Sequence, residues 1–230
     1  MGEKIAYLIF DIQCLSIAFA FLVGLFIKIF RNGLNKKWEN LLFYHTLLAF
    51  IIMLLFYLET HKIININYAF KINNMSLFVN YTILSFYIIN HIHGIEIGKK
   101  YTLNIVNCII LLLIISTYNS PDVMVTEMKM KGFGLNHIGL ILLSILYLIE
   151  LSKNIPEKSI LKLPDFWIVV GVVASAIINF PIMVTIGYLF DLTLDKEILP
   201  LVSAIPPLGY FFQYCFISYS FICSLEKVKG

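Results

Sequence analysis

A few ionisable and amide side chains lie inside long apolar stretches of this sequence, and these residues are the most able to do chemistry. A polar group within a membrane-spanning segment is costly to bury, so each one marks a functional site by default. Asp11 is the clearest case, because it lies about two helical turns inside the first apolar stretch, with Gln13 beside it. Glu59 and Glu150 lie where apolar stretches end, so we expect their carboxylates to reach water.

Amide and phenol side chains in later apolar stretches could form one site with Asp11. Asn179 is followed by Pro181, and a proline within a helix frees a backbone carbonyl about one turn back. The same effect is expected from the prolines of the last apolar stretch, Pro200, Pro206 and Pro207. Two interpretations stay open: a ligand site that opens to the outer side of the membrane, or interhelical hydrogen bonds with ordinary helix kinks. The predicted ligand-binding residues are Asp11, Gln13, Asn80, Tyr81, Asn179, Tyr188, Tyr210 and Gln213.

Three histidines form a second group, which we expect near the inner face of the membrane. Histidine is the commonest metal ligand and titrates near neutral pH. His91 and His93 are two residues apart, so on a helix they point about 200° apart and cannot share one metal ion. No cysteine or carboxylate joins them at a metal-site spacing. We therefore predict no metal, haem or other cofactor, and treat His45, His91 and His93 only as weak candidates for metal ligands and as interfacial side chains with water access.

Several chemistries are excluded or made improbable by what the sequence lacks. The last apolar stretch, 198–223, contains no lysine for a retinal Schiff base. There is no glycine-rich phosphate loop, no His-Glu-x-x-His zinc motif and no Gly-x-Ser-x-Gly nucleophile motif. No basic block is long enough to bind nucleic acid. An integral-membrane enzyme that acts on lipid through Asp11 or His91 stays an alternative, although no motif singles it out.

The composition predicts the elements that must position these residues. The chain has 230 residues, of which 60% are hydrophobic and 13% charged, and its mean hydropathy is +0.87. A spanning helix needs about 20 mostly apolar residues, so we predict an all-α polytopic membrane protein with about seven helices in a single domain, 1–230. The first stretch is longer than a signal peptide's apolar region, so we expect it to be retained. The predicted spans are 5–30, 40–59, 75–93, 101–118, 135–152, 166–190 and 198–223, and the longest loop is 119–134.

The distribution of basic residues predicts the orientation. Cytoplasmic loops retain an excess of lysine and arginine. With seven spans, 11 of the 17 basic residues fall on one side and six on the other. We therefore place the amino terminus outside and the carboxyl terminus in the cytoplasm. The expected location is the inner membrane or plasma membrane of the cell. The cysteines, all within apolar stretches, are expected to be small buried apolar side chains rather than disulfides: Cys14, Cys108, Cys215 and Cys223.

The sequence Pro164-Asp165-Phe166-Trp167-Ile168, followed by Gly171, resembles a pattern in uncharacterised seven-helix membrane proteins of Bacteroidota. Some of those proteins precede sensor histidine kinases. The resemblance extends over most of the chain in helix spacing, in the basic first inner loop and in the aromatic-rich last helix. It implies a sensory or receptor-like membrane module and supplies no catalytic residues. Only about six residues follow the last predicted helix, so we expect no output domain of the kinase-linked kind.

Three functions are compatible with this sequence. The first is a receptor-like module that binds a small or lipophilic ligand from the outer side and signals through a cytoplasmic partner or as a homo-oligomer. The second is an oligomeric pore-forming or membrane-perturbing effector, in which Asp11 or Asn179 would face the conduit. The third is the lipid enzyme described above. In each case the expected environment is the lipid bilayer.

Overall fold

The computed structural model describes residues 2–31, 37–61, 69–92, 95–118, 125–153, 159–191, 201–202 and 204–226. All regular secondary structure in these ranges is helical, which confirms the predicted all-α class. A membrane core offers no water to backbone polar groups, and a helix satisfies those groups within one segment. The seven long helices among the described residues are α1 (Gly2–Arg31), α2 (Lys37–Thr60), α3 (Ala69–His91), α4 (Ile97–Tyr118), α5 (Val125–Lys153), α6 (Pro164–Asp191) and α8 (Ile205–Glu226), and a 3-10 turn, η1 (Ile160–Lys162), precedes α6.

Five of these helices are long and apolar enough to cross a membrane, as judged over the described residues. This indicates a membrane protein. The apolar segments are Lys4–Ile29 in α1, Glu39–Glu59 in α2, Ile97–Ser116 in α4, Gly134–Lys153 in α5 and Pro164–Ile182 in α6.

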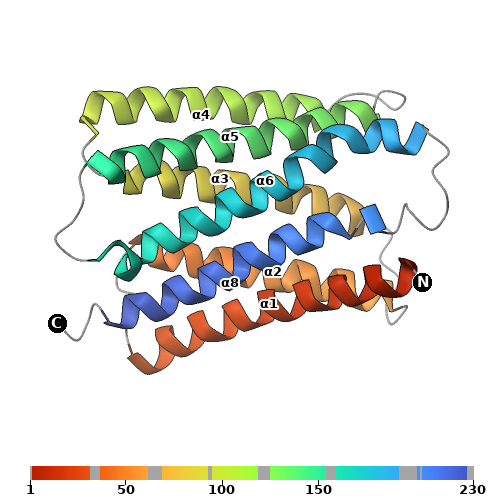
Figure 1. The fold of residues 1–230 in the computed structure, drawn as a ribbon, viewed down its shortest axis with the longest axis horizontal. Coiled ribbons are helices and arrows are strands. Elements are labelled where there is room, and N and C mark those ends of the chain that lie inside the picture. The colour runs from red at the N-terminus through yellow and green to blue at the C-terminus, as the bar shows by residue number, and fades with distance from the viewer. Residues whose placement is uncertain are drawn as a thin grey trace.

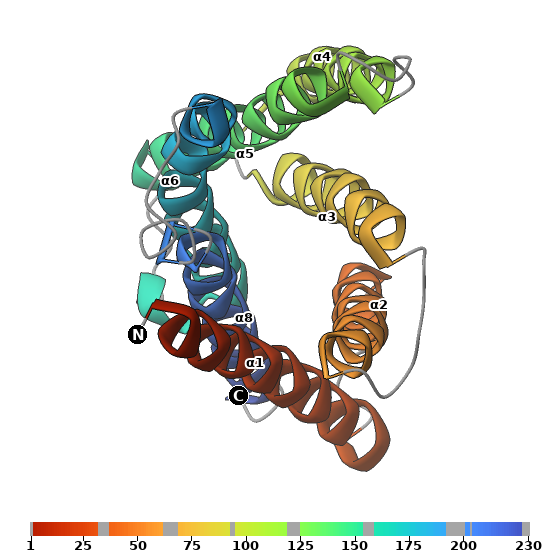
Figure 2. The same cartoon turned by 90° about the vertical axis from the view of Figure 1, so that its right-hand side faces the viewer.

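The helices lie side by side along one long axis, with successive helices running in opposite directions (Figure 1). Viewed along that axis, α4, α5, α6, α8 and α1 follow one another in a curved layer, and α3 and α2 close the arrangement on its inner side (Figure 2). α6 packs against both α5 and α8, whereas α3 contacts α2, α4, α5 and α6. Fully buried side chains from several helices form one apolar core, among them Leu42, Leu84, Ile168 and Ile217.

The outer surface of α4 carries a continuous apolar stripe. Ile97, Tyr101, Ile105, Ile109 and Leu112 follow one another at intervals of three or four residues, which places them on one helix face. Each of these side chains is more than half exposed. A soluble protein rarely exposes such a stripe, whereas a lipid-facing helix needs one.

The structure corrects two predicted boundaries. Residues 125–134, predicted to belong to a loop, form the start of α5, and all but the last of them precede its membrane-length segment. Glu, Met and Lys are good helix formers, so this polar part can extend α5 beyond the apolar part. The last long helix begins at Ile205 rather than near residue 198. Pro206 and Pro207 therefore lie in its first turn, where proline's missing N–H costs nothing and frees no carbonyl. Pro200 lies outside the described residues.

The expectation for the cysteines is only partly correct. None of the four forms a disulfide, as expected, and Cys223 is buried. Cys108 and Cys215, however, are exposed on the outer surfaces of α4 and α8. Because an apolar outer surface of the bundle would face lipid, a small thiol side chain is as compatible with these positions as with the core.

Candidate functional site

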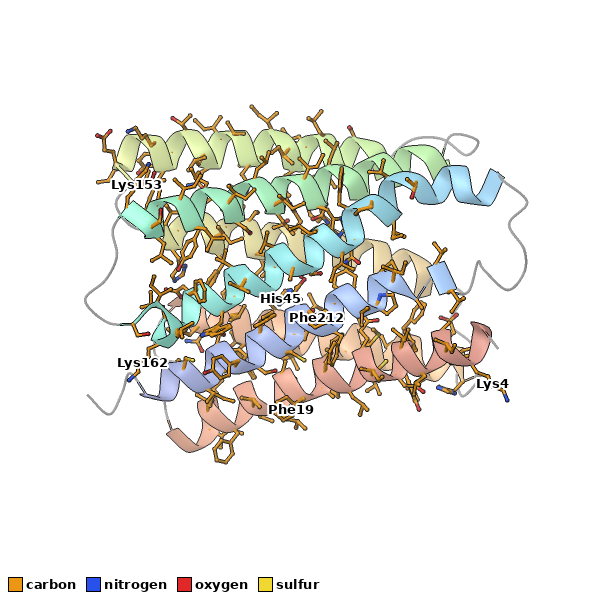
Figure 3. All side chains as sticks on the ribbon, viewed as in Figure 1. Lys4, Phe19, His45, Lys153, Lys162 and Phe212 are labelled. Atoms are coloured by element: carbon orange, nitrogen blue, oxygen red, sulfur yellow. The ribbon has the colours of Figure 1, made fainter. Side chains whose placement is uncertain are left out.

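A polar cluster joins α2, α3 and α8 in the interior of the bundle. The side-chain oxygen Oδ1 of Asn80 lies 2.6 Å from Nε2 of His45 and accepts a 3.3 Å hydrogen bond from Nε2 of Gln213. The His45 ring is stacked on Tyr214 with ring centroids 6.1 Å apart. Figure 3 shows His45 near the middle of the long axis. We call His45, Asn80 and Gln213 the central cluster.

Helical periodicity explains why these polar side chains face inward. In α2, His45 lies in sequence between the buried residues Phe43 and Thr46 and is only 3% exposed. In α8, Gln213 is 2% exposed and follows Gly209 by one turn on the same face. The polar groups lie on core-facing stripes, so their hydrogen bonds must be made within the bundle.

Two atoms at or beside the central cluster lack a hydrogen-bond partner within the described part of the chain. Nδ1 of His45 is buried and unpaired, and so is Oδ1 of Asn179 in α6. The Asn179 amide donates from Nδ2 to Ser175 Oγ at 3.3 Å. It also packs directly against Gly209, where a Cβ atom would lie 2.7 Å from Oδ1. Gly209 lies about one turn before Gln213 in α8, so Asn179 packs beside the same face of α8.

Tyr81, although next to Asn80 in sequence, lies in a different polar chain. Its hydroxyl donates a 2.9 Å hydrogen bond to Oδ1 of Asn107 in α4, and Asn107 Nδ2 donates to Ser85 Oγ at 3.0 Å. Successive residues on a helix point about 100° apart, which directs Asn80 toward α2 and α8 and Tyr81 toward α4 and α5. The structure therefore places these two predicted site residues in separate hydrogen-bonded groups.

Asp11 and Gln13 lie in α1. Oδ1 of Asp11 is 3.9 Å from Nε2 of His61, just after the end of α2, and both side chains are about 40% exposed. This pair lies near one end of the bundle. Gln13 is buried, and its backbone carbonyl accepts a hydrogen bond from Ser16 Oγ.

The remaining predicted residues are placed as follows. Tyr210 is partly buried in α8 and packs against the apolar core. The side chain of Tyr188 and the whole of His93 lie outside the described residues.

The predicted grouping of His45 with His91 is not the one that the structure shows. His91 lies at the end of α3, where Nδ1 is 2.8 Å from the backbone oxygen of Tyr87 and Nε2 is 3.8 Å from Oδ1 of Asp165. Tyr87 donates to the same Asp165 oxygen at 2.5 Å. We call Tyr87, His91 and Asp165 the end cluster. Within the described residues, no three histidine, cysteine or acidic side chains are placed to hold a metal ion.

Sequence reasoning missed several of these partners. Asp165 was included only as part of a motif, and Tyr87, Asn107 and Tyr214 were not singled out. Depth along the helix offered one signal: His45 lies about two turns from the start of α2, too deep for an interfacial residue. Which residues His45 contacts depends on the rotation of α2 about its own axis. That rotation is set by packing between helices and could not be derived from the sequence.

No family model, curated protein or solved structure matches this chain. The resemblance to the Bacteroidota membrane proteins therefore stays a prediction.

Proposed function

We propose that this protein is a receptor-like membrane module with seven spans, its amino terminus outside and its carboxyl terminus in the cytoplasm. In this proposal a small or lipophilic ligand enters from the outer side, binds at the central cluster and changes how the protein associates with a partner or with further copies of itself. The five potential spans support insertion in a membrane, and the excess of basic residues in alternate loops supports the orientation.

One observation carries the functional part of the proposal. The central cluster is a buried polar centre with an unpaired atom, Nδ1 of His45, in a region where an unmade hydrogen bond is costly. Its hydrogen bonds join an imidazole to two carboxamides. Such groups recognise and orient a ligand, and they include no strong nucleophile. A binding role therefore fits this cluster better than a hydrolytic one.

A route for the signal follows from the spacing within α3. Asn80 and Tyr87 are seven residues apart and so lie on the same helix face. Asn80 connects α3 to α8, and Tyr87 connects α3 to α6 at the proposed cytoplasmic end. A ligand that hydrogen-bonds to the central cluster would change the position of α3 and thereby the contacts of the end cluster.

The proposal is tested by purifying the full chain in mild detergent and identifying bound small molecules by native mass spectrometry. We expect a molecule that stays with the wild-type protein and is lost from Gln213→Leu. Leu112→Ala, a change on the exposed face of α4, is the control and should retain the molecule. If no such molecule is found, or if Gln213→Leu retains it, the receptor proposal is wrong.

A second measurement separates the proposal from the other two functions. Liposomes that contain the protein should remain impermeable to ions, and added phospholipid should not be converted to a product. A large ring with ion leak would instead support the pore-forming effector. Phospholipid turnover that is lost on changing Asp11 or His91 would support the lipid enzyme.

A further inference from the structure

The hydrogen-bond pattern of the central cluster fixes which His45 nitrogen carries the proton. Asn80 Oδ1 faces Nε2 of both Gln213 and His45, and an oxygen can only accept. Both nitrogens therefore donate to it. A neutral imidazole has one donor and one acceptor, so Nδ1 of His45 is a lone-pair acceptor. A doubly protonated ring would place a positive charge in the core and is disfavoured there.

The His45 acceptor is held in place but unused. The side chain is 3% exposed, its Nε2 is fixed by Asn80, and its ring is stacked on Tyr214 at an interplanar angle of 8°. Within the ranges that the structure describes, no donor reaches Nδ1. A fixed ring with an unpaired nitrogen is suited to receive a hydrogen bond from a molecule that is not part of the chain.

A second unused acceptor lies nearby. Asn179 is fully buried, its Nδ2 is engaged by Ser175, and its Oδ1 has no donor among the described residues. The amide packs on Gly209, which shares a face of α8 with Gln213. The interior therefore presents two unpaired acceptors, one in α2 and one in α6.

From this pattern, and resting on the receptor function proposed above, we infer that the ligand is a neutral lipophilic molecule that donates a hydroxyl hydrogen bond, of the phenol or alcohol class. A ketone, ether or anion would place lone pairs against the lone pair of His45 Nδ1. An ammonium ion would be desolvated beside amides without a carboxylate among the three residues of the central cluster. A hydroxyl satisfies the acceptor without charge, and an apolar body matches entry through a bilayer.

The test compares two probes of the same shape, 4-pentylphenol and its methyl ether, 4-pentylanisole. Binding to the full chain in lipid nanodiscs is measured by calorimetry and by the shift in thermal unfolding temperature. We expect the phenol to bind the wild-type protein at least ~10-fold more tightly than the ether, which corresponds to one hydrogen bond. This comparison needs no variant and so does not depend on a variant's ability to fold.

Two variants then locate the acceptor. His45→Phe keeps an aromatic ring on Tyr214 but removes Nδ1, and it should abolish the preference for the phenol. Asn179→Leu removes the second acceptor and should keep the preference, because the single hydrogen of the phenol is donated to Nδ1 of His45. His61→Phe, at the end of α2 and away from the central cluster, is the matched control and should keep the preference.

Equal binding of the two probes, or tighter binding of the ether, would overturn the inference. Failure of both probes to bind would also overturn it. These results would leave the receptor proposal standing if a retained molecule is found by mass spectrometry. If no molecule is retained either, both the proposed function and the inference about its ligand are wrong.

Discussion

The hydroxyl of Tyr87 in α3 donates a 2.5 Å hydrogen bond to Oδ1 of Asp165 in the first turn of α6, 78 positions later in the chain. His91, one turn after Tyr87, places Nε2 3.8 Å from the same oxygen. The Asp165 carboxylate also benefits from the partial positive charge at the start of α6. One carboxylate thus connects α3 to α6 at the end of the bundle where α3 ends and α6 begins.

Tyr87→Phe should destabilise the protein, because it removes a buried hydrogen bond to a charged group while keeping the ring that stacks on His91. Such bonds contribute about 1.5–3 kcal/mol, so we expect a loss of free energy of unfolding in this range. Denaturant unfolding in detergent measures it. Tyr101→Phe, on the exposed face of α4, is the control and should have little effect. Equal stability of the two variants would show that the Tyr87 bond contributes nothing.

The motif that begins α6 has a physical role at each position described here. Pro164 is the first helical residue, where its missing N–H is harmless. Trp167 donates from its ring nitrogen to the Leu161 carbonyl at 2.8 Å and stacks on Phe216. Gly171 allows α8 to approach, since a Cβ there would lie 2.7 Å from Cβ of Phe216. The segment therefore fixes how α6 sits against η1 and α8, while Asp165 connects it to α3.

Gly139→Ala should destabilise the protein even though alanine is the better helix former. A Cβ at position 139 would lie 2.7 Å from the Tyr81 hydroxyl, so the ring would have to move and its hydrogen bond to Asn107 would weaken. We expect a loss of about 1–3 kcal/mol from overpacking. Gly98→Ala is the matched control, because no atom lies within 4 Å of a Cβ there.

The two glycine variants should differ in thermal stability, with only Gly139→Ala below the wild-type protein. Gly98→Ala should be neutral or stabilising by up to about 1 kcal/mol, as helix propensity alone predicts. If both variants gain stability, the close contact between Gly139 and Tyr81 does not exist in the folded protein.

Much of the fold could be predicted from apolar length, and little of the side-chain pairing could. The apolar stretches predicted a helix at the place of every long helix described here, because a long apolar stretch in a membrane can hardly fold otherwise. The polar start of α5 was missed, since hydropathy carries no signal for a helix that projects into water. Asn80 and Gln213 were both selected as buried polar residues, whereas their meeting with His45 depends on helix rotation and depth, which only packing decides.

The proposed topology predicts which positions an impermeant thiol reagent can reach. Lys4 lies at one end of the bundle, and Lys153 and Lys162 lie at the other (Figure 3). In a background without the four native cysteines, Lys4→Cys should react in intact cells. Lys162→Cys should react only after the membrane is permeabilised. The reverse pattern would mean that the orientation is inverted. Labelling of both positions in intact cells would contradict an odd number of spans between positions 4 and 162.

The central cluster should behave as one energetic unit, because Asn80 Oδ1 accepts from two helices at once. A double-mutant cycle of Asn80→Ala with Gln213→Ala, measured by unfolding in detergent, should give a coupling free energy of about 0.5–1.5 kcal/mol, the range of interhelical hydrogen bonds in membranes. Asn80→Ala with Tyr101→Phe is the control pair and should be additive, since Tyr101 faces outward on α4. Additivity of both pairs would mean that Asn80 and Gln213 do not share a hydrogen bond, and the route proposed from the central cluster to Tyr87 would lose its first step.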